Sequence, residues 1–420
     1  MMMAKLAWKN IWRNKTRSLV VIIATSLGLW AGIFASAFVK GMMEQKINNV
    51  IEKELSHFQI HDPGFKDEYL PEFLIRNDTE ILNDLENRPE VKGVASRVIA
   101  MGMISSPKNA GSIRVNGIIP GEEKVVTSLD SRVAEGSYFG EDRKNQILIS
   151  QKTADHLKVR LKSKVVITVQ DMNREIAAGA FRVTGIYASD NPLFDEMNVY
   201  VQQKDLRSLL GVTEGTHEIA VLLREHDLAE PMAEEYRKKY PNLLVEPWLD
   251  LSSGMRYMVE AFDSYVYFIV GIILLALILS IINTMLMAIL ERTREIGMLM
   301  AIGMNKVRLF ALILTETVFL SLIGGPVGLL ISWLTIRYFS IRGINLVGAA
   351  YGEMGFGNVV YPFLEFESYI GVTIMVMVMA VLAAAGVRYE EWFAVAFRMW
   401  ALLMGIGAVA VIVAVATGLS

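Results

Sequence analysis

The chain has 420 residues, of which 53% are hydrophobic and 20% are charged. This composition is too apolar for an ordinary soluble domain and too charged for a protein wholly buried in lipid, so it predicts a membrane anchor with a sizeable water-exposed domain. The net charge of -3 gives no support for nucleic-acid binding, and the lack of cysteine excludes disulfides, cysteine-ligated metals and a thiol nucleophile.

Residues 1–17 form a basic segment that also carries tryptophan. On a helix, basic residues four positions apart form one stripe, and the tryptophans lie beside it. This pattern favours a helix in the inner headgroup layer of the membrane, and generic stop-transfer charges are the alternative. The residues concerned are Lys5, Trp8, Lys9, Trp12, Arg13 and Arg17.

Four apolar runs are long enough to cross a bilayer, which takes roughly 20 helical residues. They cover residues 18–39, 265–290, 309–336 and 368–387. Lys and Arg gather before the first run, between the second and third, and after the fourth. Because positive charge marks the cytoplasmic side, we expect a multi-pass protein with a cytoplasmic N-terminus and an extracytoplasmic loop at 337–367.

Residues 40–264 are then extracytoplasmic and long enough for one or two domains. Apolar spacing predicts that the first helix continues past residue 40 as a stalk and that 249–264 forms a second stalk. Strands and helices mix without a βαβ rhythm, which favours an α+β fold over a doubly wound sheet. We expect strands at 57–61, 96–105, 112–121, 164–171, 181–189 and 198–202, and helices at 78–88, 151–159, 202–210 and 228–240.

The segment 291–308, ERTREIGMLMAIGMNKVR, combines paired charges, an apolar stripe and two glycines in a loop predicted to be cytoplasmic. On a helix, residues three and four apart share a face. Spacing alone leaves two interpretations open: a docking helix for a cytosolic partner, or charges that only enforce topology. The residues of the possible contact surface are Glu291, Arg292, Arg294, Glu295, Gly297, Met298, Ala301 and Gly303.

The third run contains an acid, Glu316, and a cluster of glycines. An acid inside a span is a functional candidate, although pairing with a basic neighbour is as plausible here as proton handling. The glycines Gly324, Gly325 and Gly328 are typical of close helix packing or of a flexible point in the helix.

Motifs for catalysis are missing from the sequence. It contains no Walker-type phosphate loop and no G-x-S-x-G elbow. His57 and His61 are four apart, but they lie in a strand pattern, where this spacing separates side chains, so a zinc pair is not favoured. We therefore expect no enzymatic activity, cofactor or metal in this chain itself.

Several of these segments together resemble the permease subunits of the MacB/FtsX superfamily of ABC transporters, also called type VII. The most specific is ERTREIGMLMAIGMNKVRLF, followed by Glu316 and LIGGPVGLL. The basic start LAWKNIWRNKTRSL, NGIIPGEE, LISQKTADHLKV and FRVTGIY add weight by their order. Within the superfamily, the lipoprotein-releasing permeases of the LolC/LolE type are the most similar.

The resemblance implies a mechanism and a set of partners. Two permeases, identical or paralogous, sit in the bacterial inner membrane on two copies of a separate ABC ATPase, which binds ATP and Mg. The helix at 291–308 docks on that ATPase, and this favours the docking interpretation. ATP-driven dimerisation then moves the stalks and reshapes the extracytoplasmic domains, which is called mechanotransmission.

The C-terminal tail departs from the family. Members end soon after the fourth span, whereas residues 388–420 here include a further uncharged run. This tail is either a fifth span or an altered end of the chain.

The resemblance leaves three functions open. The first is release of lipoproteins from the membrane, and the second is export of a small amphiphile or peptide. The third is a regulatory scaffold that activates a cell-wall hydrolase. The large extracytoplasmic domain favours transport, since scaffolds of this kind carry a much smaller one.

Overall fold

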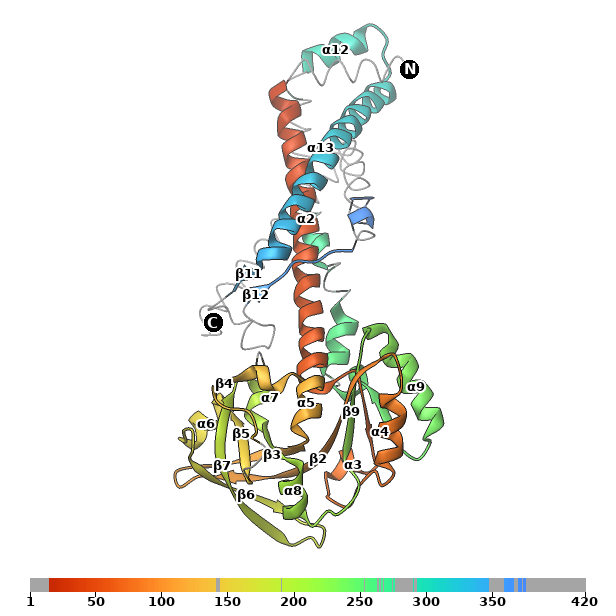
Figure 1. Cartoon of the computed structure of the whole chain (residues 1–420). Helices are drawn as coiled ribbons and strands as arrows, with labels where there is room; N and C mark the ends of the chain where they lie inside the picture. The colour runs from red at the N-terminus through yellow and green to blue at the C-terminus, as the bar shows by residue number, and fades with distance from the viewer. Residues whose placement is uncertain are drawn as a thin grey trace. The chain divides into compact units, whose positions relative to one another are not determined.

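The computed structural model describes residues 15–140, 144–189, 191–252, 254–262, 264, 266, 268–273, 275, 290, 293–346, 359–365, 369–371, 373 and 374. The chain divides into two compact units (Figure 1). The helical unit comprises Met1–Gly41, Asp263–Gly343 and Tyr361–Ser420, and the α+β unit comprises Met42–Phe262 and Ile344–Val360.

One part of the α+β unit is an antiparallel sheet with the order β10-β1-β9-β2. Its strands are β10 (Leu244–Pro247), β1 (Phe58–His61), β9 (Glu218–Leu223) and β2 (Val91–Ser105). Helices α4 (Asp78–Glu86) and α9 (Ala229–Lys239) pack on one face, and α5 (Pro120–Val126) packs on the other. Alternate residues of β9 face the two layers, so the whole strand is buried.

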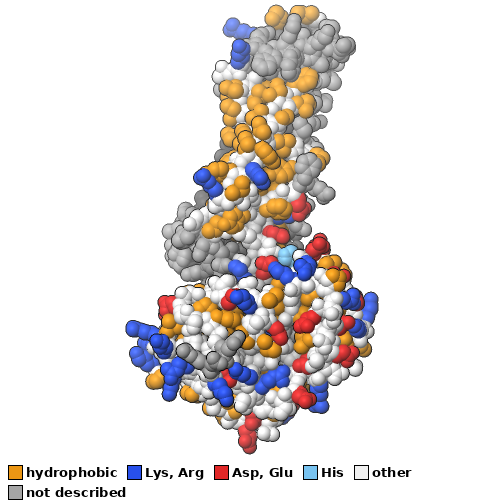
Figure 2. All heavy atoms as spheres, in the orientation of Figure 1, with side chains coloured by type: hydrophobic (Ala, Val, Ile, Leu, Met, Phe, Trp, Pro, Cys, Tyr) orange, Lys and Arg blue, Asp and Glu red, His pale blue; other side chains and the backbone are white. Residues whose placement is uncertain are grey.

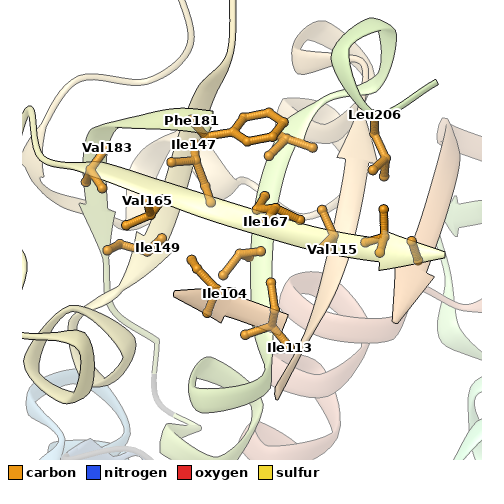
Figure 3. Close-up of a cluster of buried hydrophobic side chains, with 14 of the residues drawn as sticks. Ile104, Ile113, Val115, Ile147, Ile149, Val165, Ile167, Phe181, Val183 and Leu206 are labelled. Atoms are coloured by element: carbon orange, nitrogen blue, oxygen red, sulfur yellow. The ribbon is translucent and has the colours of Figure 1, made fainter. Parts of the chain in front are cut away.

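The other part of the α+β unit is a barrel. Strand β2 continues into it, and the strands close in the order β2-β3-β8-β5-β7-β6. Besides β2 these are β3 (Ala110–Ile118), β5 (Gln146–Ser150), β6 (Lys164–Gln170), β7 (Ile176–Tyr187) and β8 (Asn198–Gln202). Branched side chains such as Ile104, Val115 and Ile167 fill its interior (Figure 3). Helices α6 (Gln151–Leu157) and α8 (Gln203–Leu210) add leucines to this core.

Shorter elements complete the α+β unit. They are α3 (Phe65–Glu68), the 3-10 turns Leu129–Arg132 and His226–Leu228, β4 (Val133–Gly136), α7 (Pro192–Met197), α10 (Trp248–Leu251), and the pair β11 (Ile344–Asn345) and β12 (Val359–Val360).

A buried ion network joins the sheet to the barrel at the middle of β2. Arg97 donates two hydrogen bonds to Glu123 of α5, at 2.9 and 2.8 Å, and one to Glu218 of β9 at 2.6 Å. Arg114 of β3 and His61 of β1 reach the other oxygen of Glu218 at 2.8 and 3.2 Å. Burial alone would raise the pKa of Glu218, but Arg114, Arg97 and His61 hold this pKa well below its usual value.

The helical unit is built on two long helices, α2 (Lys15–Val50) and α13 (Lys306–Arg342), and on the shorter α12 (Thr293–Ala301). The last residues of α2, from Met42, and the π-helical turn Ile51–Leu55 that follows belong to the α+β unit. Among the described residues, the helices Ser18–Leu55 and Val318–Arg342 are long and apolar enough to cross a membrane. The second and fourth predicted spans lie largely outside the described residues, and the tail 388–420 lies wholly outside them.

The α+β fold class is confirmed, whereas several elements differ from the sequence prediction. The predicted strand 112–121 ends at Ile118, because Pro120 begins α5. The predicted stalk helix at 249–264 is interrupted, because Ser252 adopts an extended backbone after α10. The sequence patterns also missed β4, β5, β9, β10, α5 and α7.

We predict that Arg97→Met destabilises the α+β unit by about 3–5 kcal/mol, because Glu123 and Glu218 would remain buried without their cation. This corresponds to a fall in Tm of roughly 10 °C for a domain of this size. Thermal unfolding of the purified chain measures the effect. Arg174→Met is the matched control, since Arg174 pairs with Glu72 at the surface, where an ion pair contributes about 0–1 kcal/mol. Equal Tm values for the two variants would contradict a structural role of the network.

We also predict that the α+β unit loses stability as the pH falls below 6.5. Burial lowers the pKa of His217 to about 4, and its ring accepts a hydrogen bond from the Ile99 N–H at 3.1 Å. An unfolded histidine has a pKa of about 6.5, so the unfolded state binds more protons between pH 6.5 and 4. At pH 5 the loss from His217 is roughly 2 kcal/mol. The fall in Tm between pH 7 and pH 5 should be smaller in His217→Asn than in the wild type, since asparagine keeps an acceptor for the Ile99 N–H. An equal fall in the two proteins would exclude His217 as the cause.

Candidate functional site

Helix α12 carries four described residues of the predicted contact surface, Arg294, Gly297, Met298 and Ala301, and Ile302 follows it directly. Arg294, Met298 and Ile302 are spaced four apart and share one face, although Ile302 lies just past the last helical residue. The Met298 side chain is 60% exposed and Ile302 is 79% exposed. Figure 2 shows the described apolar side chains of the helical unit at the surface. An exposed apolar face bearing a cation is suited to a protein partner.

Gly303 ends this helix earlier than the sequence predicts. Its φ of +98° is a conformation that other residues adopt only with strain, and its N–H bonds to the Met300 carbonyl at 3.0 Å. The predicted segment 291–308 is therefore a short helix, a tight turn and the start of α13 at Lys306. A Cβ atom placed on Gly297 or Gly303 would meet open space, so a partner backbone can approach both.

The structure describes only some of the other residues that were predicted for this surface and for the interfacial helix. Ala301 is the last, exposed residue of α12, and Glu295 contributes its backbone to this helix. Arg17 contributes its backbone to α2. Glu291, Arg292, Lys5, Trp8, Lys9, Trp12 and Arg13 lie outside the described residues.

The predicted packing glycines lie where α13 meets α2. A Cβ atom on Gly324 would be 3.1 Å from the Ile22 carbonyl oxygen, and one on Gly328 would be 2.8 Å from that of Ser26. The Ser26 hydroxyl donates to the Gly324 carbonyl at 2.8 Å. This spacing of small residues allows close helix approach and satisfies polar groups between the helices. Gly325 and Glu316 are buried in the same helix.

The π-helical turn fixes the lower end of α2 in the α+β unit. Ile51 is fully buried against Ala95, Val126, Ala220 and Leu222. The Glu54 carboxylate accepts hydrogen bonds from the Asn191 amide, with both oxygens at 3.0 Å, and Asn191 caps α7. The turn is therefore packed on the sheet core and hydrogen-bonded to the cap of α7. Sequence patterns gave no signal for this contact, because the two residues are far apart in the chain.

The histidines and the NGIIPGEE motif have structural partners. The Nε2 atom of His57 lies 2.9 Å from Nδ1 of His226, whereas His61 contacts Glu218, so His57 and His61 do not share a ligand. Glu122 of the motif accepts from Ser96 N–H at 2.9 Å, and Glu123 holds Arg97. Among the described residues, no group of three or more potential metal ligands gathers.

Two family models match the chain. The MacB-like periplasmic core domain matches residues 18–239, more than half of the chain, and the FtsX-like permease C-terminal model matches residues 267–390. The second match includes α12 and α13, and the first includes the barrel, the sheet strands β1, β2 and β9, and α2 from residue 18.

Curated relatives agree with these models. The uncharacterized ABC transporter permease MJ1507 of Methanocaldococcus jannaschii is 24% identical and is similar over 90% of this chain and 92% of its own length. The uncharacterized ABC transporter permease YknZ of Bacillus subtilis is 23% identical over 77% of this chain and 83% of its own. The probable export ATP-binding/permease protein MacB of Pseudomonas entomophila is 23% identical, and the match covers 78% of this chain but only 50% of that protein.

These relatives carry the names of permeases and export proteins, so similarity to lipoprotein-releasing permeases in particular stays a prediction. The two matched models follow one another along the chain in the order that the sequence motifs predict. The chain therefore belongs to the family of ABC transporter permeases that combine a MacB-like periplasmic core domain with an FtsX-like permease region.

Proposed function

We propose that this permease works by mechanotransmission and that α12 is the helix through which a separate ATPase drives it. The exposed face of Arg294, Met298 and Ile302 carries this proposal. It combines an adaptable apolar surface with a charge that can set register against a partner. We expect Glu291, Arg292 and Glu295 of the same segment to extend this surface.

The ATPase would be a second protein, since the sequence has no phosphate loop of its own. Two copies of it would bind ATP and Mg and pair with two permeases, identical or paralogous. The N-terminus and α12 would then face the cytoplasm of the inner membrane, and the α+β unit would face outward. The MacB relative supports such a pairing, because its name joins an ATP-binding part to a permease in one chain.

The route of the mechanical signal would be α2. A helix rises 1.5 Å per residue and transmits axial displacement well when its end is held. The end of α2 is held by buried Ile51 and by the Glu54–Asn191 hydrogen bonds. Movement of α2 would thus change the α+β unit rather than be absorbed by a loose linker.

The cargo we propose is a lipoprotein that is released from the membrane. The large α+β unit supports this function, because a domain of this size offers a surface for a protein cargo outside the bilayer. Export of a small amphiphile or peptide is the second candidate, favoured by the word export in the name of the MacB relative. Purification of the native complex and identification of the co-purified cargo would separate the two.

We predict that reversing Glu291 and Glu295 to Lys abolishes the stimulation of ATP hydrolysis by the permease. Opposite charge at the docking surface becomes like charge, which costs several kcal/mol at an interface. The measurement is ATP turnover of the reconstituted complex. Reversal of Glu175, an exposed residue of the α+β unit, is the matched control. Stimulation that survives the double reversal would exclude this segment from coupling.

We further predict that Gly303→Val lowers coupled ATP hydrolysis, whereas Gly303→Asn retains most of it. The φ of +98° strains a β-branched residue, while asparagine tolerates left-handed backbone at a smaller cost. Strain of about 1–2 kcal/mol would shift the end of α12 and its docking face. Turnover and complex assembly are measured together, and equal activity of the two variants would argue against a requirement for this turn.

A further inference from the structure

A cavity of about 650 Å³ lies within the helical unit, between α13 and residues 362–364, 369, 370, 373 and 374. Apolar side chains make up most of its wall, including Leu329, Trp333, Ile336, Phe363 and Ile370. Trp333 and Phe363 are each about half exposed, so the cavity is an open groove that an additional molecule can enter. We call it the α13 groove.

The wall formed by α13 is a stripe along one face of the helix. Leu329, Trp333, Ile336 and Arg337 follow the spacing of a helical face. From Leu329 to Arg337 the helix rises about 12 Å, at 1.5 Å per residue. One leaflet of a bilayer has roughly 15 Å of hydrocarbon. The apolar part of the groove is thus somewhat shorter than the hydrocarbon of one leaflet, and Arg337 lies at its end.

The opposite wall is attached to the helix bundle. The Phe363 N–H donates to the Ala37 carbonyl of α2 at 3.0 Å, and Lys40 forms an ion pair with Glu365 at 3.1 Å. These contacts hold the segment beside α2 while its side chains line the groove. The part of this wall around Phe363 and Glu365 is therefore attached to α2 of the same unit.

Two arginines near the end of α13 differ in their surroundings. Arg342 donates to the Tyr338 hydroxyl at 2.6 Å and lies over the Tyr338 ring at 4.9 Å. Arg337 lines the groove and makes no ion pair with the residues that the structure describes. This end of α13 is expected to be extracytoplasmic, where Lys and Arg are usually scarce. An arginine there, at the end of an apolar groove, is complementary to an anionic group on an amphiphile.

We propose that the α13 groove binds an anionic glycerophospholipid of the surrounding bilayer. One acyl chain packs along Leu329, Trp333 and Ile336, and Arg337 binds the phosphate. The positive charge of Arg337 favours an anionic lipid over a zwitterionic one, in which an ammonium group offsets the charge of the phosphate, and the apolar stripe favours an acyl chain. The inference rests on the groove alone and does not depend on the proposed coupling to an ATPase.

The test uses the full chain, purified in detergent and incubated with equal amounts of phosphatidylglycerol and phosphatidylcholine of the same acyl composition. Native mass spectrometry counts the lipids that stay bound. We expect the wild type to bind more phosphatidylglycerol than phosphatidylcholine. In Arg337→Gln the ratio of the two bound lipids should fall about tenfold, which is the effect of losing one charge-assisted hydrogen bond. Arg337→Lys should retain most of it, because the positive charge remains.

Matched variants separate headgroup and acyl-chain recognition. Arg342→Gln removes a neighbouring charge that lies outside the groove lining and should leave the preference unchanged. Leu329→Trp fills the groove and should reduce retention of both lipids, whereas Leu330→Trp, on an exposed position of the same helix, should not.

Three results would overturn the proposal. Equal loss of preference in Arg337→Gln and Arg342→Gln would show a general charge effect. Displacement of the lipid by millimolar inorganic phosphate would identify a site for a free anion. Because the chain has no cysteine, Trp333→Cys can report a second copy, and efficient disulfide cross-linking of this variant in the membrane would show that another permease covers the groove.

Discussion

The carboxylate of Glu218 is the point on which the α+β unit depends. It is 1% exposed and contacts Arg97 of β2, Arg114 of β3 and His61 of β1. A buried carboxylate is costly unless cations and hydrogen-bond donors surround it. Here two arginines and a histidine from three strands surround it, and Arg97 also binds Glu123 of α5. The network thus lies at the position where β2 leaves the antiparallel sheet and enters the barrel.

This arrangement gives the unit a firm attachment for α2. The π-helical turn packs on the same sheet through Ile51, beside α5, and α5 itself is anchored by the Glu123–Arg97 pair. The turn thus contacts the sheet through Ile51 and the Asn191 cap of α7 through Glu54. The sheet that contains the buried ion network is also the sheet on which the end of α2 packs. We propose that movement of α2 acts on the unit at this contact.

Local patterns predicted the elements whose side chains alternate or repeat clearly. Strand β1 and helices α4, α6, α8 and α9 lie close to the predicted ranges. Strand β9 was missed because it is buried on both faces and reads as a continuous apolar run without alternation. Helix α5 was missed because its PGEEKVV sequence is short and its glutamates point to partners that only the fold brings near.

The sequence by itself determined that the chain is a membrane protein with an α+β domain. It also determined the family and the segment that contains α12. These follow from composition, charge asymmetry and the order of local motifs, which depend only on neighbouring residues. Only the tertiary structure decided that β2 is shared by a sheet and a barrel, that Glu218 joins three strands, that Gly303 ends α12 and that Arg337 lies in an apolar groove. The physical reason is that each of these features depends on pairing between residues far apart in the chain, or on a backbone conformation, neither of which the periodicity of a single segment encodes.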